Sequence, residues 1–134
     1  MTARQFALEI DREFAEMMGD AKAVVARIGL EAVKRVVQKS PVDKGRFKGN
    51  WSLSVGQIDS ATTERTDPSG GATISRAAGA VSAYSTIEGF PVIYVQNNLP
   101  YASRLEDGWS SQAPAGVLGL TVVELEAMFA SEEI

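Results

Sequence analysis

The 134-residue sequence predicts an α+β fold in one domain, residues 1–134, with a long N-terminal helix packed on a small, mostly antiparallel sheet and short helices after it. Three observations support this prediction. Apolar residues recur every three or four positions over most of the first forty residues. Two short segments rich in β-branched and aromatic residues are separated by a long connection. The length fits a single domain and leaves little room for two.

The first helix is predicted over residues 4–39, and it ends at Ser40 because a residue that precedes proline avoids helical angles. At 1.5 Å per residue it would be roughly 50 Å long, whereas a compact domain of this size is about 36 Å across. We therefore expect either a break near Gly19 and Asp20 or an overhang that packs on a second copy. The apolar stripe comprises Phe6, Ile10, Phe14, Met17, Ala21, Val25, Ile28, Ala32 and Val36.

The middle of the chain predicts a turn-rich connector, a strand, a loop and a helix. Residues 41–50 contain two glycines and a proline and form the connector. Residues 51–55 alternate apolar and small polar side chains, which is typical of a half-buried strand. Residues 59–71 are rich in Thr, Asp, Ser and Gly and are expected to be an exposed loop. A helix is predicted over 72–87, although Gly79 weakens it.

The last part of the chain predicts a strand followed by two helices. Residues 91–96 are the clearest strand, with β-branched and aromatic residues in succession. A short helix is expected over 99–106, with Asn98 as its cap and Gly108 ending it. Residues 117–129 predict a final helix that is apolar on more than one side.

The composition argues against catalysis, and we expect no catalytic, metal-binding or cofactor-binding residues. The chain has no cysteine and no histidine, which removes thiol chemistry and the commonest general base near neutral pH. It also lacks the glycine-rich phosphate-binding patterns. Glu106 and Asp107 form the one carboxylate pair that a small hydrolase could use. Adjacent residues at a helix end diverge, so one of them is expected to cap or solvate the turn before Gly108.

The net charge of −4 is distributed unevenly. Such polarity suits head-to-tail contact between copies, although solvated faces explain single charges equally well. Within the basic segment, Lys44, Arg46 and Lys48 are candidate contacts to a partner or, non-specifically, to DNA phosphates. Basic residues gather at Lys34, Arg35, Lys39, Lys44, Arg46 and Lys48, and acidic ones at Glu9, Asp11, Glu13, Glu16, Asp20, Glu124, Glu126, Glu132 and Glu133.

Residues 97–116 predict a rigid arrangement of turns around a short helix. Tyr101, Ala102 and Leu105 share a helical face and are expected to pack inward. Trp109 is predicted to be either an interface anchor or part of the core. Gln112 can donate and accept hydrogen bonds, so it suits an exposed backbone edge.

Two motifs resemble the tail-component or tail-completion family of tailed double-stranded DNA phages. They are S-P-V-D-K-G-R-F-K-G-N-W at 40–51 and V-I-Y-V-Q-N-N-L-P-Y-A-S-R-L-E-D-G-W-S-S-Q-A-P-A-G-V at 92–117. Lys44 departs from the family pattern, which usually has threonine there. Together with the anchor Trp109, the matching positions are Pro41, Val42, Asp43, Gly45, Phe47, Trp51, Asn97, Pro100, Tyr101, Ala102, Leu105, Glu106, Gly108, Gln112, Pro114 and Gly116.

The resemblance implies a structural virion protein of the phage neck or tail. Such a protein forms a ring, here expected to be hexameric, around the DNA channel, and it completes the tail or joins it to the head. The implied partners are further copies, head-closure or connector proteins, and a tail terminator or tail tube protein. The implied location is the virion, and the host cytoplasm during assembly. No apolar run is long enough to cross a membrane. The alternative is a non-enzymatic dimeric binding or regulatory module built on the long helix.

Overall fold

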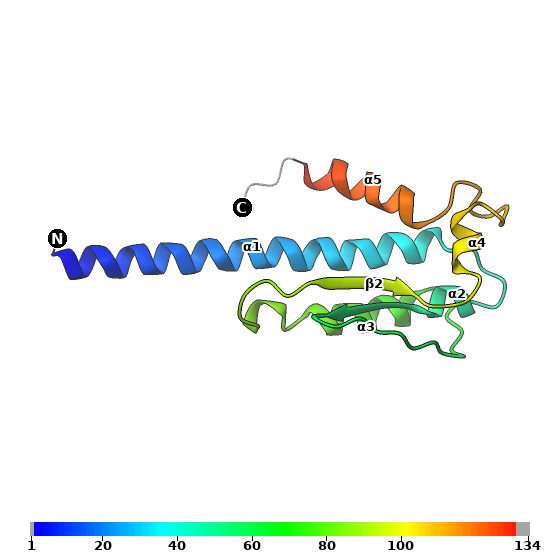
Figure 1. Ribbon diagram of the computed structural model, residues 1–134, viewed down its shortest axis with the longest axis horizontal. Coiled ribbons are helices and arrows are strands. Elements are labelled where there is room, and N and C mark those ends of the chain that lie inside the picture. Colours follow the sequence, from blue (N-terminus) through cyan, green and yellow to red (C-terminus); the bar gives the residue numbers. More distant parts are fainter. Residues whose placement is uncertain (1, 131–134) are drawn as a thin grey trace.

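The computed structural model describes residues 2–130, and a single long helix sets its shape (Figure 1). Helix α1 (Ala3–Lys39) is continuous, so a break near Gly19 does not occur. A capping box starts it: Thr2 Oγ1 accepts from the Gln5 backbone N–H, and the Gln5 side chain accepts from the Thr2 N–H. The helix ends at Lys39, and the extended backbone of Ser40 leads into Pro41 as predicted.

The predicted antiparallel sheet is confirmed and consists of two strands. Strand β1 (Trp51–Val55) pairs with β2 (Ile93–Asn97), so that Trp51 lies opposite Asn97 and Val55 opposite Ile93. Helix α3 (Gly71–Val81) packs against both β1 and α1, and its buried residues Ala77 and Val81 join the core around Val33. The helix predicted over 72–87 is thus shorter than expected, and the separate 3-10 turn η1 (Tyr84–Thr86) follows it.

Only the C-terminal half of α1 belongs to the hydrophobic core. Val33, Val36 and Val37 are completely or almost completely buried against the sheet and α3. Residues 3–20, named the free half of α1 below, extend beyond every other element (Figure 1). Four of the predicted stripe residues in the free half are exposed, namely Phe6, Ile10, Phe14 and Met17.

The loop between β1 and α3 is mostly exposed, as predicted, but it is anchored at its end. Asp67 is buried, and its carboxylate accepts hydrogen bonds from the Thr73 N–H and hydroxyl and from the Gly70 N–H. Burial alone would raise the Asp67 pKa, but these hydrogen bonds and the charge of Arg76 outweigh it, so that the pKa is lowered. The loop therefore ends in a fixed turn that starts α3.

Three further helices complete the chain. The sequence did not predict α2 (Arg46–Gly49), which lies within the connector. Helix α4 (Ala102–Glu106) begins later than expected, and Asn98 does not cap it, because the Asn98 amide donates to the carbonyl groups of Asp59 and Ala61 instead.

Helix α5 (Leu118–Phe129) returns along α1, on the side opposite the sheet (Figure 1). Arg35 and Lys39 of α1 form ion pairs with Glu124 of α5. Of the predicted acidic C-terminal cluster, Glu132 and Glu133 lie outside the described residues. In the part of the chain that the structure describes, no helix combines the length and apolar character needed to span a bilayer.

Candidate interaction site

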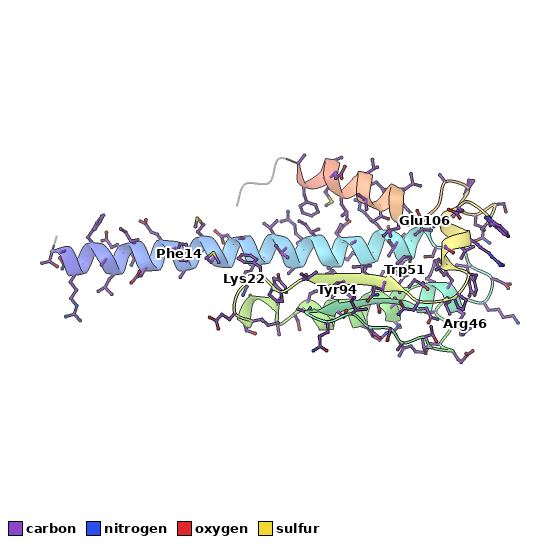
Figure 2. All side chains as sticks on the ribbon, viewed as in Figure 1. Phe14, Lys22, Arg46, Trp51, Tyr94 and Glu106 are labelled. Atoms are coloured by element: carbon purple, nitrogen blue, oxygen red, sulfur yellow. The ribbon has the colours of Figure 1, made fainter. Side chains whose placement is uncertain are left out.

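The two motif segments meet at the C-terminal end of α1. We name residues 40–51 and 97–117 the turn junction. A pocket of about 390 Å³ lies between them and is lined from both sides. Arg46 and Glu106 mark this end of the molecule in Figure 2, opposite the free half with Phe14. The lining residues are Pro41, Val42, Asp43, Lys44, Gly45, Arg46, Phe47, Tyr101, Leu105, Ser110 and Gln112.

Side-chain amides join the two segments through backbone groups. The Gln112 Oε1 accepts from the Val42 N–H at 2.9 Å, and the Gln112 Nε2 donates to the Val42 carbonyl at 3.0 Å. Asn97 Nδ2 donates to the Phe47 carbonyl at 2.8 Å, and Asn97 Oδ1 accepts from the Leu99 N–H at 3.3 Å. The expectation that Gln112 binds exposed backbone is confirmed. These amides hold one segment against the other.

An aromatic cluster lies behind the pocket. The ring of Phe47 meets that of Trp51 edge-on at 5.7 Å and lies 6.2 Å from that of Tyr101. Trp51 Nε1 donates to Ser40 Oγ at 2.7 Å, and Ser40 Oγ donates in turn to the Val36 carbonyl at 2.6 Å. These contacts tie the turn junction to the last turn of α1. Tyr101 and Leu105, together with Ala102, pack against the core as predicted.

Glu106 caps helix α5. Its Oε1 accepts from the N–H groups of Val117 and Leu118 at 2.9 and 2.6 Å, and its Oε2 accepts from the Gly119 N–H at 2.9 Å. Gly116 has a positive φ of 83°, and a side chain there would collide with the Glu106 carbonyl. Of the two adjacent carboxylates, Asp107 is the one exposed at the turn before Gly108, whereas Glu106 binds the start of α5. A bound helix cap is also unsuited to proton transfer.

The Glu106 carboxylate should make stability depend on pH. Burial acts to raise its pKa, but the three backbone hydrogen bonds outweigh burial and hold the pKa below the ordinary value of 4.5. A pKa that is lower in the folded state stabilises the protein above about pH 4.5, and this stabilisation is lost as the pH falls through the folded value.

We expect Glu106→Gln to destabilise the protein by about 1 kcal/mol at neutral pH, because a neutral amide is a weaker acceptor at a helix N-terminus. The difference from the wild type should shrink as the pH falls below about 4.5. Urea unfolding at several pH values measures both effects. The matched control is Asp107→Asn at the exposed neighbouring residue. A constant difference at all pH values would contradict the capping role.

The remaining predicted site residues differ in how far their side chains are exposed to solvent. Asp43, Lys44 and Pro100 are exposed, and Pro114 is exposed with its carbonyl against Gly108. Arg46 is half-buried and pairs with Glu64 at 3.0 Å. The basic candidates Lys44, Arg46 and Lys48 do not form one patch, because Lys48 is buried. Of these candidates, Lys44 and Arg46 remain accessible to a partner.

Trp109 lies on the surface, so the interpretation of this residue as part of the core is wrong. Its side chain is 71% exposed, the highest value among the exposed large hydrophobic residues. The Arg104 guanidinium lies 5.2 Å from the centre of its ring, a cation–π contact that favours this orientation of the indole. A large exposed aromatic side chain held in this way is suited to contact with another protein.

The geometry defines an α+β protein with a rigid turn junction at one end of a rod and an uncovered apolar helix at the other. Comparison of the chain with models of known protein families, with curated protein sequences and with solved structures finds no match. Among residues 2–130, no group of three or more His, Cys, Asp or Glu side chains could hold a metal ion.

Proposed function

We propose that the protein is a structural component of the neck or tail of a tailed double-stranded DNA phage. Copies of the chain form a ring around the DNA channel, and the ring completes the tail or joins it to the head. The observation that carries this proposal is the turn junction. The two segments with the phage-like motifs are far apart in the sequence, yet they form one surface around a common pocket.

The use of the polar side chains in the turn junction supports a structural role and not an enzymatic one. Gln112, Asn97 and Glu106 each bind backbone groups of a neighbouring segment. A catalytic acid, base or nucleophile must reach a substrate atom with its proton-transferring or nucleophilic group. These three side chains instead hold the backbone segments of the turn junction in place. A subunit that packs between neighbouring subunits requires a surface of fixed shape. We infer that the protein is not an enzyme and needs no cofactor.

In this proposal the turn junction faces the next protein layer. Trp109 supplies an exposed aromatic anchor, and Lys44 and Arg46, also in the turn junction, supply positive charge for an acidic partner or for DNA phosphates. The partners are further copies of the chain, head-closure or connector proteins, and a tail terminator or tail tube protein. The site of action is the virion, and assembly takes place in the host cytoplasm.

A second candidate function is a dimeric binding or regulatory module. The free half of α1 favours it, because an uncovered apolar helix can pair with the same helix of a second copy. Such a protein would form closed pairs in solution and would be absent from virus particles.

Electron microscopy of phage particles that carry the tagged protein tests the proposal. We expect the tag at the junction of head and tail, in a ring of identical subunits. Particles without the tag, or a tag elsewhere on the virion, would refute the neck role. Light scattering of the purified chain separates the candidates, because a hexameric ring has three times the mass of a dimer.

Trp109→Ala should weaken assembly by tenfold or more, on the order expected when an exposed aromatic anchor is lost from an interface. The monomer should remain folded, because this side chain contributes little to the core. Light scattering across a concentration series measures the change. The matched control is Ile58→Ala, another exposed apolar residue, which lies in the loop after β1. A variant that assembles like the wild type would remove Trp109 from the interface.

A further inference from the structure

We propose that the free half of α1 binds a second copy of this chain, in an apolar groove between α1 and β2. The groove has a volume of about 280 Å³ and is lined by Val25, Ile28, Gly29 and Ala32 of α1 and by Ile93 and Val95 of β2. This inference rests on the proposed self-assembly, and it names the two surfaces that make the contact.

The donor surface is a stripe on the free half. Phe6, Ile10, Phe14 and Met17 lie on one helical face and are between 46% and 57% exposed. Figure 2 shows Phe14 on the part of α1 that projects beyond every other element. Exposure of this stripe to water is unfavourable, because burial of each large apolar side chain contributes about 1.5–3 kcal/mol of free energy.

The receiving surface continues the same stripe. Ala21, Val25, Ile28 and Ala32 follow on the same face of α1, at spacings of three and four residues that match those of the free half. Val25, Ile28 and Ala32 are half-buried and line the groove, whereas Ala21 is buried. Gly29 at the groove floor lets Ile93 pack close to the α1 backbone. The stripe of the free half includes phenylalanine and methionine side chains, whereas the groove includes Gly29 and Ala32. The large side chains of one copy can therefore insert between the small ones of the other.

The free half is long enough to cover the groove. At 1.5 Å per residue, the free half is about 27 Å long, whereas the groove residues of α1, from Val25 to Ala32, span about 10 Å. One free half can therefore cover the whole groove of a second copy without reaching past its turn junction.

The charges of the two halves are complementary. Residues 2–20 contain five acidic and two basic side chains, whereas residues 21–39 contain five basic and one acidic. A free half laid along the embedded half of another copy brings opposite net charges together, and it keeps like halves apart. The same segregation disfavours contact between two free halves, which would juxtapose like charges. A second copy is thus the occupant that matches the groove in shape and charge.

Engineered cysteines test the contact directly, because the chain has none of its own. We pair Phe14→Cys with Val25→Cys in one variant and with Ile28→Cys in another. Positions 14 and 25 lie about 16 Å apart on the same straight helix, too far for a disulfide within one chain. Oxidation followed by non-reducing electrophoresis should give covalent oligomers. The control pairs Phe14→Cys with Ala80→Cys on the exposed side of α3, and single variants report any link between identical positions.

A variant that fills the groove provides a second measurement. Ala32→Trp should weaken association at least tenfold in light scattering, because the new indole occupies the place of the free half. Ala80→Trp, at an exposed position of α3, should leave association unchanged. Circular dichroism confirms that both variants are folded before association is compared.

The outcomes separate this inference from the proposed function. Cross-links from both groove positions, without a comparable product from the control pair, support the inference. A ladder of products up to the ring agrees with the neck role, whereas covalent pairs alone support the groove contact but favour the dimeric candidate. Rings that assemble with no cross-link to the groove, and with normal association of Ala32→Trp, would overturn the inference and leave the neck role intact.

Discussion

Trp51→Ala is expected to destabilise the protein by about 3–5 kcal/mol, the range observed when large aromatic core residues are truncated. Trp51 is only 7% exposed and packs edge-on against Phe47. Its indole N–H also donates to Ser40 Oγ, so the variant leaves a buried hydroxyl without this donor. Because Ser40 and Phe47 both belong to the turn junction, the loss should loosen its attachment to the end of α1.

Chemical unfolding followed by circular dichroism measures the effect. The chain offers a matched control in its other tryptophan, since Trp109→Ala removes the same atoms from an exposed site. Surface substitutions usually change stability by at most about 0.5 kcal/mol. Equal losses from the two variants would show that the burial described for Trp51 is incorrect.

Gly45→Ala should destabilise the protein by about 2–4 kcal/mol, through backbone strain and a steric clash together. Gly45 has a φ of 87°, a left-handed conformation that costs an alanine residue about 1–2 kcal/mol. A Cβ atom there would lie 2.5 Å from the Pro68 nitrogen and 2.8 Å from the Asp67 carbonyl carbon. Backbone atoms cannot rotate away as a side chain can, so the loop that ends at Asp67 would have to move.

The control for Gly45→Ala is Gly79→Ala in helix α3, where no neighbouring atom lies within 4 Å of the added methyl group. Alanine in an open helical position is expected to stabilise the protein by up to about 1 kcal/mol. The two substitutions add the same group with opposite expected signs. Thermal unfolding compares them, and a stabilised Gly45→Ala variant would contradict the tight contact with the Asp67 turn.

Local patterns predicted those elements whose signals lie within a few residues. The stripe from Phe6 to Val36 indicated a long helix, and Ser40–Pro41 marked its end. Alternation in 51–55 and β-branched residues near 93 gave both strands of the sheet. The absence of histidine and cysteine removed whole classes of chemistry from consideration. The short helix α2 was not predicted, because a single turn that follows Gly45 and ends at Gly49 has no periodicity to detect.

The candidate site depended on contacts between distant segments. The motif segments were visible in the sequence, but their meeting around one pocket was not. Gln112 was expected to bind a backbone edge, while its partner Val42 lies seventy positions away in the chain. Glu106 ends helix α4, but its carboxylate caps α5, a helix that starts more than ten residues further along the chain. The type of side chain determines whether a residue can donate or accept hydrogen bonds, but the tertiary fold determines which partner it meets.

The sequence by itself determined that the N-terminal region is a long amphipathic helix, that two strands pair beside it, and that the chain has no imidazole or thiol groups. Only the structure showed that α1 continues unbroken through Gly19. The tertiary structure alone decided which part of the stripe is buried, and that Trp109 faces outward. The physical reason is that periodicity specifies the apolar face of a helix but not its partner. The sheet, α3 and α5 cover only the second half of α1, and the stripe of the first half stays exposed.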